Sequence, residues 1–195
     1  MQIVFRLEVR VDAWLACQGR VDTPRPESCP TCGCAWLTFD GWRPRQTRRG
    51  RVDIHRVRCA SEGCPQRSHS LVPDVLVSGR VDLVSVIGWA LERKAAGWGH
   101  RRIAGRLEVC QSTARRWLRR AARHGMGIAG RLVATAAAAD PGVRAPPVGG
   151  PVEVMVAAAR LAAQAYGRLS GEAVDVWRYA VAVTGGALLG LTGTI

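Results

Sequence analysis

Four cysteines stand in two closely spaced pairs, Cys29 with Cys32 and Cys59 with Cys64. Two such pairs on the two turns of a β-hairpin supply the four soft ligands that zinc takes in a tetrahedron. The 26 residues between the pairs are a suitable length for that hairpin, and CPxCG favours a turn that aims backbone N–H groups at the sulfurs. The spacing therefore predicts one structural zinc ion held by these four thiolates.

Two further side chains are reserve ligands for that site. His69 replaces a sulfur if the four-residue gap in the second pair cannot close, and Cys34 is too near Cys32 to join the same tetrahedron comfortably. Two alternatives remain open: a redox-active CxxC, which leaves the second pair unexplained, or cysteines buried independently as small apolar residues. We interpret Cys17 and Cys110, both in predicted helices, as packing residues.

The basic charge is concentrated in the first two-thirds of the chain. Lys and Arg together number 28 against 15 acidic residues, and Lys94 is the only lysine. Residues 131–195 carry a net charge of +1, so the remaining +12 lies in residues 1–130. Because guanidinium groups pair bidentately with phosphate, the expected partner is a nucleic acid and not a small-molecule substrate.

A helical apolar period begins at Asp82, which we expect to cap a first helix ending near Gly97. A short second helix over 100–107, a turn containing a core-facing Val109, and a third helix over 111–124 follow. Such a unit places polar side chains at the start of its last helix in the major groove, with arginines behind them on phosphates. The candidate DNA-contacting residues are Gln111, Ser112, Thr113, Arg115, Arg116, Arg119, Arg120 and Arg123 on the third helix, and Arg101 and Arg102 on the second.

Base recognition in this unit would fall to its first turn. Gln111 can pair bidentately with adenine, and Arg115 or Arg116 with guanine. The alternatives are a solvated basic face on an ordinary three-helix bundle, or RNA binding. The segment RPRQTRRGR, between the cysteine pairs, is predicted to be a basic hairpin turn that lies along the phosphate backbone, or else a solvated tip. Its candidate contacts are Arg45, Arg48, Arg49 and Arg51.

The remaining segments place these units in an α+β chain of several modules. Residues 2–12 alternate as a half-buried strand, and a short helix capped by Asp12 ends at Gly19. Two C-terminal helices, the second capped by Ser170, are apolar enough to pack on each other, on the body or on a second copy as a homodimer. The predicted modules are 1–78, an N-terminal strand, helix and small β zinc ribbon; 79–130, a three-helix helix-turn-helix domain; 131–151, a linker; and 152–195, a C-terminal helical segment.

No stretch of the sequence is typical of a membrane span or a secretory leader. Charges interrupt the first 15 residues, and the uncharged run 179–195 is shorter than the ~20 residues of a spanning helix. We interpret that run as a buried or interfacial helix with a loose tail. The expected location is cytoplasmic and nucleoid-associated, where disulfides are disfavoured and clustered cysteines favour metal.

Two resemblances extend these expectations. IAGRLEVCQSTARRWLRR resembles the helix-turn-helix that opens many bacterial transposases, with Glu108 in place of its glycine and Cys110 in place of its serine. The order of motifs over residues 1–125 is similar to a high-GC bacterial family named only as a domain of unknown function. The matching residues are Cys29, Cys32, Gly33, Arg58, Cys59, Cys64, His69, Leu71, Val72, Pro73 and Gly99 to Leu107. That family implies a zinc ribbon, helix-turn-helix DNA binding and transposon ancestry.

We therefore expect a non-catalytic DNA-binding protein, either a transcriptional regulator or a transposon-derived factor. A transposase needs a carboxylate triad that holds Mg²⁺ on a separate nuclease fold. After the third helix only Asp140, Glu153, Glu172 and Asp175 remain, and there is no room for that fold. The alternatives are the DNA-recognition part of a transposase system whose catalytic chain is separate, or a zinc-stabilised protein-interaction module.

Overall fold

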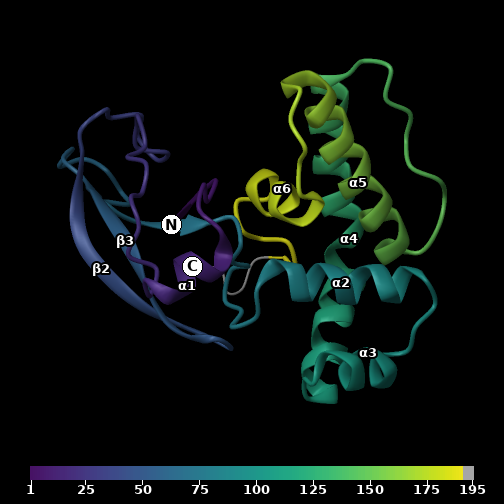
Figure 1. Cartoon of the computed structure of the whole chain (residues 1–195). Helices are drawn as coiled ribbons and strands as arrows, with labels where there is room; N and C mark the ends of the chain where they lie inside the picture. The colour runs from purple at the N-terminus through teal and green to yellow at the C-terminus, as the bar shows by residue number, and fades with distance from the viewer. Residues whose placement is uncertain (191–195) are drawn as a thin grey trace.

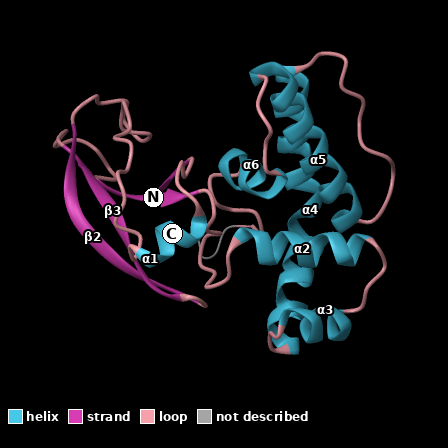
Figure 2. Cartoon of the chain, viewed as in Figure 1, coloured by secondary structure: helices cyan, strands magenta, loops and turns pink. Residues whose placement is uncertain are grey.

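A long β-hairpin and a group of packed helices form the two halves of the chain in a computed structural model that describes residues 1–190 (Figures 1 and 2). The described residues contain four strands and six helices, which confirms the expected mixture of α and β structure. The strands are β1 (Gln2–Phe5), β2 (Leu37–Thr47), β3 (Gly50–Cys59) and β4 (Ser68–Pro73). The helices are α1 (Val11–Ala16), α2 (Val84–Ala95), α3 (His100–Leu107), α4 (Gln111–Ala139), α5 (Pro151–Ser170) and α6 (Val176–Val183).

The four strands form one sheet in the order β1-β4-β3-β2. β2 and β3 are an antiparallel hairpin, and β1 runs parallel to β4. The hairpin register shifts between Phe39 and Trp42, where Gly41 has a φ of 74°. That bulge bends the outer edge of the sheet, and β2 and β3 are visibly curved in Figure 1.

The N-terminal strand is shorter than the alternation over 2–12 predicted. β1 ends at Phe5, and α1 begins at Val11 with Arg10 as its N-cap, so the expected cap at Asp12 is wrong. The backbone N–H of Leu7 donates to the Asp74 carboxylate at 3.3 Å instead of to a neighbouring strand. Because tertiary contacts of this kind take over the backbone donors, an alternating pattern overstates the strand.

The basic segment RPRQTRRGR is strand over most of its length and not a turn. β2 continues to Thr47, β3 begins at Gly50, and the connection is two residues long. The Thr47 hydroxyl donates to the Gly50 carbonyl at 2.6 Å and accepts from the Arg49 backbone N–H at 3.2 Å. These bonds close the hairpin, and β2, which carries Arg43 and Arg45, is an edge strand of the sheet.

Helices α2 to α6 share one apolar core. Its members include Leu91 of α2, Ile103 of α3, Trp117 of α4 and Met155 of α5, all buried. A glycine lets two helices approach closely, because a Cβ on Gly125 would lie 2.5 Å from the carbonyl oxygen of residue 151. The C-terminal helices thus bury their apolar faces within the chain, against α4 and α2, one of the packing modes the sequence left open.

α4 runs 29 residues, to Ala139, so the helix occupies the first nine residues of the expected 131–151 linker. Leu132 and Ala136 are buried in the core, and alanine has the highest helix propensity of the residues that made this stretch look like a linker. Only residues 140–150 connect α4 to α5. The module boundary at 130 is therefore wrong.

Two expected helix caps also differ. The N-cap of α2 is Leu83, and Asp82 is instead buried in an ion pair with Arg48. Ser170 is the last residue of α5, whereas the Asp175 carboxylate caps α6 by accepting from the N–H groups of residues 177 and 178 at 3.0 and 2.9 Å. The uncharged run after Tyr179 supplies part of α6 and a turn up to residue 190, and its expected tail at 191–195 lies outside the described residues. Among the described helices, none combines the length and hydropathy needed to cross a bilayer.

The two halves meet at a partly buried ion pair. Arg178 of α6 donates through Nε to the Asp74 carboxylate at 3.0 Å and through Nη2 to the Leu7 carbonyl at 2.5 Å. Close by, the Ser78 N–H donates to the Gly186 carbonyl at 2.9 Å. These contacts hold the C-terminal helix against the loops that leave β1 and β4.

Candidate metal centre and basic helix face

The two cysteine pairs converge at the end of the hairpin. The Sγ atoms of Cys29, Cys32, Cys59 and Cys64 all lie within 4.8 Å of one another, with 3.7 Å from Cys29 to Cys64 and 3.6 Å from Cys32 to Cys59. A tetrahedral thiolate site with metal–sulfur bonds of ~2.3 Å has sulfur–sulfur edges of ~3.8 Å. The separations match those edges and are too long for disulfides, whose sulfurs lie ~2.05 Å apart. This arrangement is a possible metal site made by the four predicted ligands.

Backbone groups position the sulfurs of the first pair. Gly33 has a φ of 74°, and its N–H donates to the Cys29 carbonyl at 2.8 Å, which closes the CPTCG turn. Burial raises the pKa of the Cys29 thiol, but the backbone amides of Thr31 and Cys32 and the His69 ring outweigh it and bring this pKa to about 6. Residue 29 is therefore preset as the thiolate that metals bind.

The net pKa shift of the second pair is in the opposite direction, because burial outweighs the backbone hydrogen bonds there. Cys59 is fully buried, and desolvation raises the pKa of its thiol to about 12. The pKa of Cys64 is also raised, again chiefly by burial. At neutral pH these two thiols are protonated when no metal is bound, and a cation that binds the cluster would displace their protons.

The reserve ligands lie beside the cluster. His69, on β4, is 1% exposed, and its Nε2 lies 3.3 Å from the Cys29 sulfur, a hydrogen-bond contact in the outer shell of the site. The Cys34 sulfur accepts a backbone N–H from Trp36 at 3.4 Å. Neither belongs to the four-sulfur group within the described residues. The expectation that Cys17 and Cys110 are packing residues is wrong, because both are exposed.

A tight turn joins α3 to α4. Glu108 adopts the left-handed conformation with a φ of 53°, and Val109 is buried with its N–H bonded to the Ala104 carbonyl at 3.1 Å. Cys110 is the N-cap of α4, and its sulfur lies 3.1 Å from the Ser112 hydroxyl. The turn therefore forms with glutamate where glycine would be less strained.

The starts of α3 and α4 together line a surface groove of about 530 Å³ with no acidic side chain in its lining. Its lining consists of His100, Arg101, Gln111, Ser112, Arg115, Arg116, Arg119, Arg120 and Arg123. Eight of the ten predicted DNA-contacting residues therefore share one groove. Thr113 is half-buried outside it, and the Arg102 guanidinium stacks on Trp98, 3.7 Å from the ring centroid.

Two basic residues beside this groove were not predicted. His100 lines it as the first residue of α3. Arg80 lies in the loop before α2. Burial, and to a smaller extent the nearby charges of Arg120 and Arg116, lower its pKa. His100 could have been found from its place at a helix start, whereas Arg80 is 36 residues from Arg116 in the chain and its approach is purely tertiary.

The four arginines proposed as backbone contacts from the hairpin all have partners inside the chain. Arg45 donates to the carbonyls of residues 77 and 80 at 2.6 and 3.0 Å, and burial lowers its pKa to about 10. Arg48 pairs with Asp82, Arg49 with Asp12 and Arg51 with Asp53. These guanidinium groups stabilise the fold, and any contact with phosphate would compete with an existing pair.

No protein-family model, no curated protein and no solved structure matches this chain.

Proposed function

We propose that the protein binds double-stranded DNA through α3 and α4, which act as a helix-turn-helix, while the cysteine cluster holds one zinc ion in a zinc ribbon. The observation that carries this proposal is the groove of α3 and α4, which gathers six arginines and no carboxylate. Gln111 and Ser112 lie at its helix-start end, where base edges are read. The arginines of the following turns would grip phosphates.

Zinc is the metal that the donor set favours. Four thiolates at tetrahedral spacing suit zinc over harder cations such as Mg²⁺, which take oxygen ligands. The metal would fix the hairpin end, and the chain's own residues would do the binding. No catalytic step is proposed, and the role is that of a regulator or a transposon-derived factor in the bacterial family it resembles.

Salt dependence tests the DNA interface. Replacing Arg115, Arg116 and Arg119 with Ala should abolish retention of duplex DNA at physiological salt. The slope of log K against log salt should become shallower by about 0.9 for each phosphate that the variant no longer neutralises. Fluorescence anisotropy with a labelled duplex over a salt series measures both effects.

A triple variant of equal charge is the control. Arg10, Arg131 and Arg144 are exposed and lie outside the groove, so replacing them with Ala removes three charges elsewhere. If this variant loses as much affinity as the groove variant, binding follows net charge and the proposed site is wrong. If only the groove variant loses affinity, selection of bound sequences from random DNA would define the target read by residues 111 and 115.

A further inference from the structure

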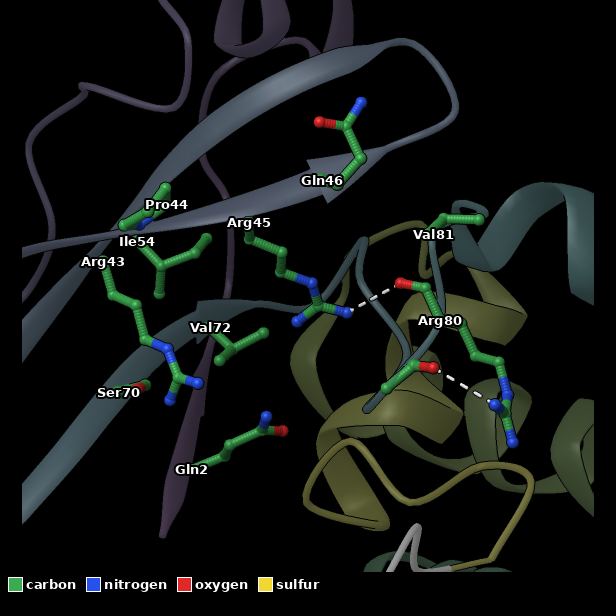
Figure 3. Close-up of a pocket in the computed structure, with 11 residues that line it drawn as sticks. Gln2, Arg43, Pro44, Arg45, Gln46, Ile54, Ser70, Val72, Arg80 and Val81 are labelled. Carbon is green, nitrogen blue, oxygen red and sulfur yellow. Dashed lines mark hydrogen bonds between the residues drawn. The ribbon is translucent and has the colours of Figure 1, made fainter.

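A second basic hollow lies on one face of the sheet, where the strands meet the loop before α2. The register pairs Arg43 with Ile54, and it pairs Ser70 with both Gln2 and Arg56, two residues beyond Ile54 on β3. Because paired residues and residues two apart point to the same face, these side chains share that face. Four of them line a hollow of about 290 Å³ (Figure 3), whose lining contains no aspartate or glutamate. The hollow therefore favours an anionic ligand.

Two guanidinium groups at this hollow have donors to spare. Arg43 is exposed and makes no hydrogen bond or ion pair in the described part of the chain. Arg45 is half-buried; its Nη2 donates to the carbonyls of residues 77 and 80, while its Nε and Nη1 have no partner among residues 1–190. No carboxylate pairs with Arg45 there, and burial lowers its pKa to about 10. Because burying a cation without a counter-ion is costly, an anion in the hollow would offset that cost.

Two neutral donors and an apolar floor complete the hollow. The Ser78 hydroxyl donates to the Oε1 atom of Gln2 at 2.5 Å, which leaves the Gln2 Nε2 donors on the side of the hollow in Figure 3. The Ser70 hydroxyl lines the same hollow and has no hydrogen-bond partner among the described residues. The floor consists of Ile54 and Val72, two buried side chains that lie between the two guanidinium groups in Figure 3. The hollow thus offers polar donors around an apolar base.

We propose that this hollow binds a small phosphomonoester, with the phosphate between Arg43 and Arg45 and the organic part against the apolar floor. Guanidinium groups hold phosphate oxygens by paired, charge-assisted hydrogen bonds, and with the neutral amide and hydroxyl they offer more donors than a carboxylate would use. The volume is close to the lower end of the range for small-molecule sites, about 300–1,000 Å³. A terminal phosphate enters such a hollow more readily than a backbone phosphate, which is linked to sugars on both sides. The site goes beyond the proposed duplex interface, which rests on different residues.

The test is isothermal titration calorimetry of the whole zinc-loaded chain, with phenyl phosphate as the probe. Arg43→Ala removes a side chain that has no internal partner, and it should weaken binding by roughly tenfold to a hundredfold, the range for one charge-assisted contact. Arg43→Lys keeps the charge without the planar fork and should restore part of the affinity. Arg10→Ala, which removes an exposed arginine outside the hollow, should bind as the wild type does. Unchanged metal content and melting temperature show that the variants fold.

Three results would overturn the proposal: no binding of phenyl phosphate, an equal loss of affinity in Arg10→Ala, or equal affinity for inorganic phosphate, which lacks the organic part. So would loss of phenyl phosphate binding in the Arg115, Arg116 and Arg119 triple variant, because α4 would then be the site. A blunt duplex without terminal phosphates should not displace the probe from that variant, and displacement would assign the hollow to the DNA backbone instead. Loss of duplex binding in the triple variant, with phenyl phosphate binding intact, leaves this proposal standing and tests the duplex interface separately.

Discussion

The two halves of the molecule are stabilised by different means. The sheet half has two small apolar clusters, one of which contains three of the clustered cysteines. The helical half has one large core that extends through α2 to α6. Small cores need a staple such as a metal, whereas a continuous core of this kind supports itself. The comparison predicts that perturbations act on one half at a time.

Removal of the metal should have the largest effect. Structural zinc contributes ~10–16 kcal/mol in small domains, so Cys59→Ser should unfold β2 and β3 while α4 and α5 stay protected. Hydrogen exchange resolved by peptide measures both halves at once. Acid should also unfold the hairpin. The metal binds thiolates, and burial raises the pKa of the Cys59 and Cys64 thiols, so these ligands are protonated as the pH falls. Cys17→Ser, at an exposed position, is the matched control. Equal protection of the hairpin with and without metal would show that the sheet half does not depend on the metal for its stability.

Truncation of the helical core should come next. Leu132 is fully buried, and Leu132→Ala should lower the free energy of unfolding by about 2–5 kcal/mol through lost burial and a cavity. Denaturant unfolding followed by far-UV circular dichroism measures this loss. Metal stoichiometry should stay at one ion per chain. A variant that loses its metal together with its helices would show that the halves fold as one unit.

The sequence predicted most of the elements that carry local signals. The cysteine spacing identified all four members of the sulfur cluster, and apolar periodicity located α2, α3, the turn and the start of α4. The errors have a common cause: they occur where tertiary contacts, and not the local sequence, determine the secondary structure. Alanines after residue 130 resemble a linker until α5 covers Leu132, and the RPRQTRRGR segment resembles a turn until β3 pairs with it.

The arginines could not be sorted from sequence for the same reason. Every arginine of the chain looks alike as a positive charge, yet Arg45 is held by two backbone carbonyls and Arg43, two residues earlier, is unpaired in the described structure. Only the fold shows which guanidinium groups are engaged. The anionic partner inferred from composition therefore stays a prediction, and the ion pairs show only which arginines already have partners inside the fold.

Breaking the ion pair between the halves should have an intermediate effect. In Arg178→Ala the Asp74 carboxylate, 6% exposed, loses its cation. Removing one partner of a fully buried pair costs about 3–5 kcal/mol, and since the Arg178 side chain is 26% exposed we expect about 2 kcal/mol. Burial raises the pKa of Asp74 in the folded protein. The protonated carboxyl group therefore stabilises the fold at low pH, and this stabilisation is lost as the pH rises through the folded-state pKa.

The loss in free energy of unfolding caused by Arg178→Ala should accordingly be larger at pH 7 than near pH 4. Urea unfolding at the two pH values measures it, and Asp74→Asn with Arg178→Ala completes a double-mutant cycle. Arg160→Ala removes an exposed α5 arginine whose nearest carboxylate, Glu92, is 3.5 Å away, and serves as the control. A pH-independent deficit would mean that the carboxylate is not the group left unpaired.

The smallest effects should separate two adjacent arginines of the hairpin turn. Arg48 pairs with Asp82, whose side chain is 2% exposed, whereas Arg49 pairs with Asp12, which is open to solvent. Arg48→Ala leaves a buried carboxylate without its cation and should lower stability by about 1–2 kcal/mol, since the arginine itself is half-exposed. Arg49→Ala removes a surface pair and should change it by less than about 0.5 kcal/mol. If both arginines serve only the fold, each variant should bind duplex DNA with the wild-type affinity. A loss of affinity confined to Arg49→Ala would show that this side chain contacts the phosphate backbone.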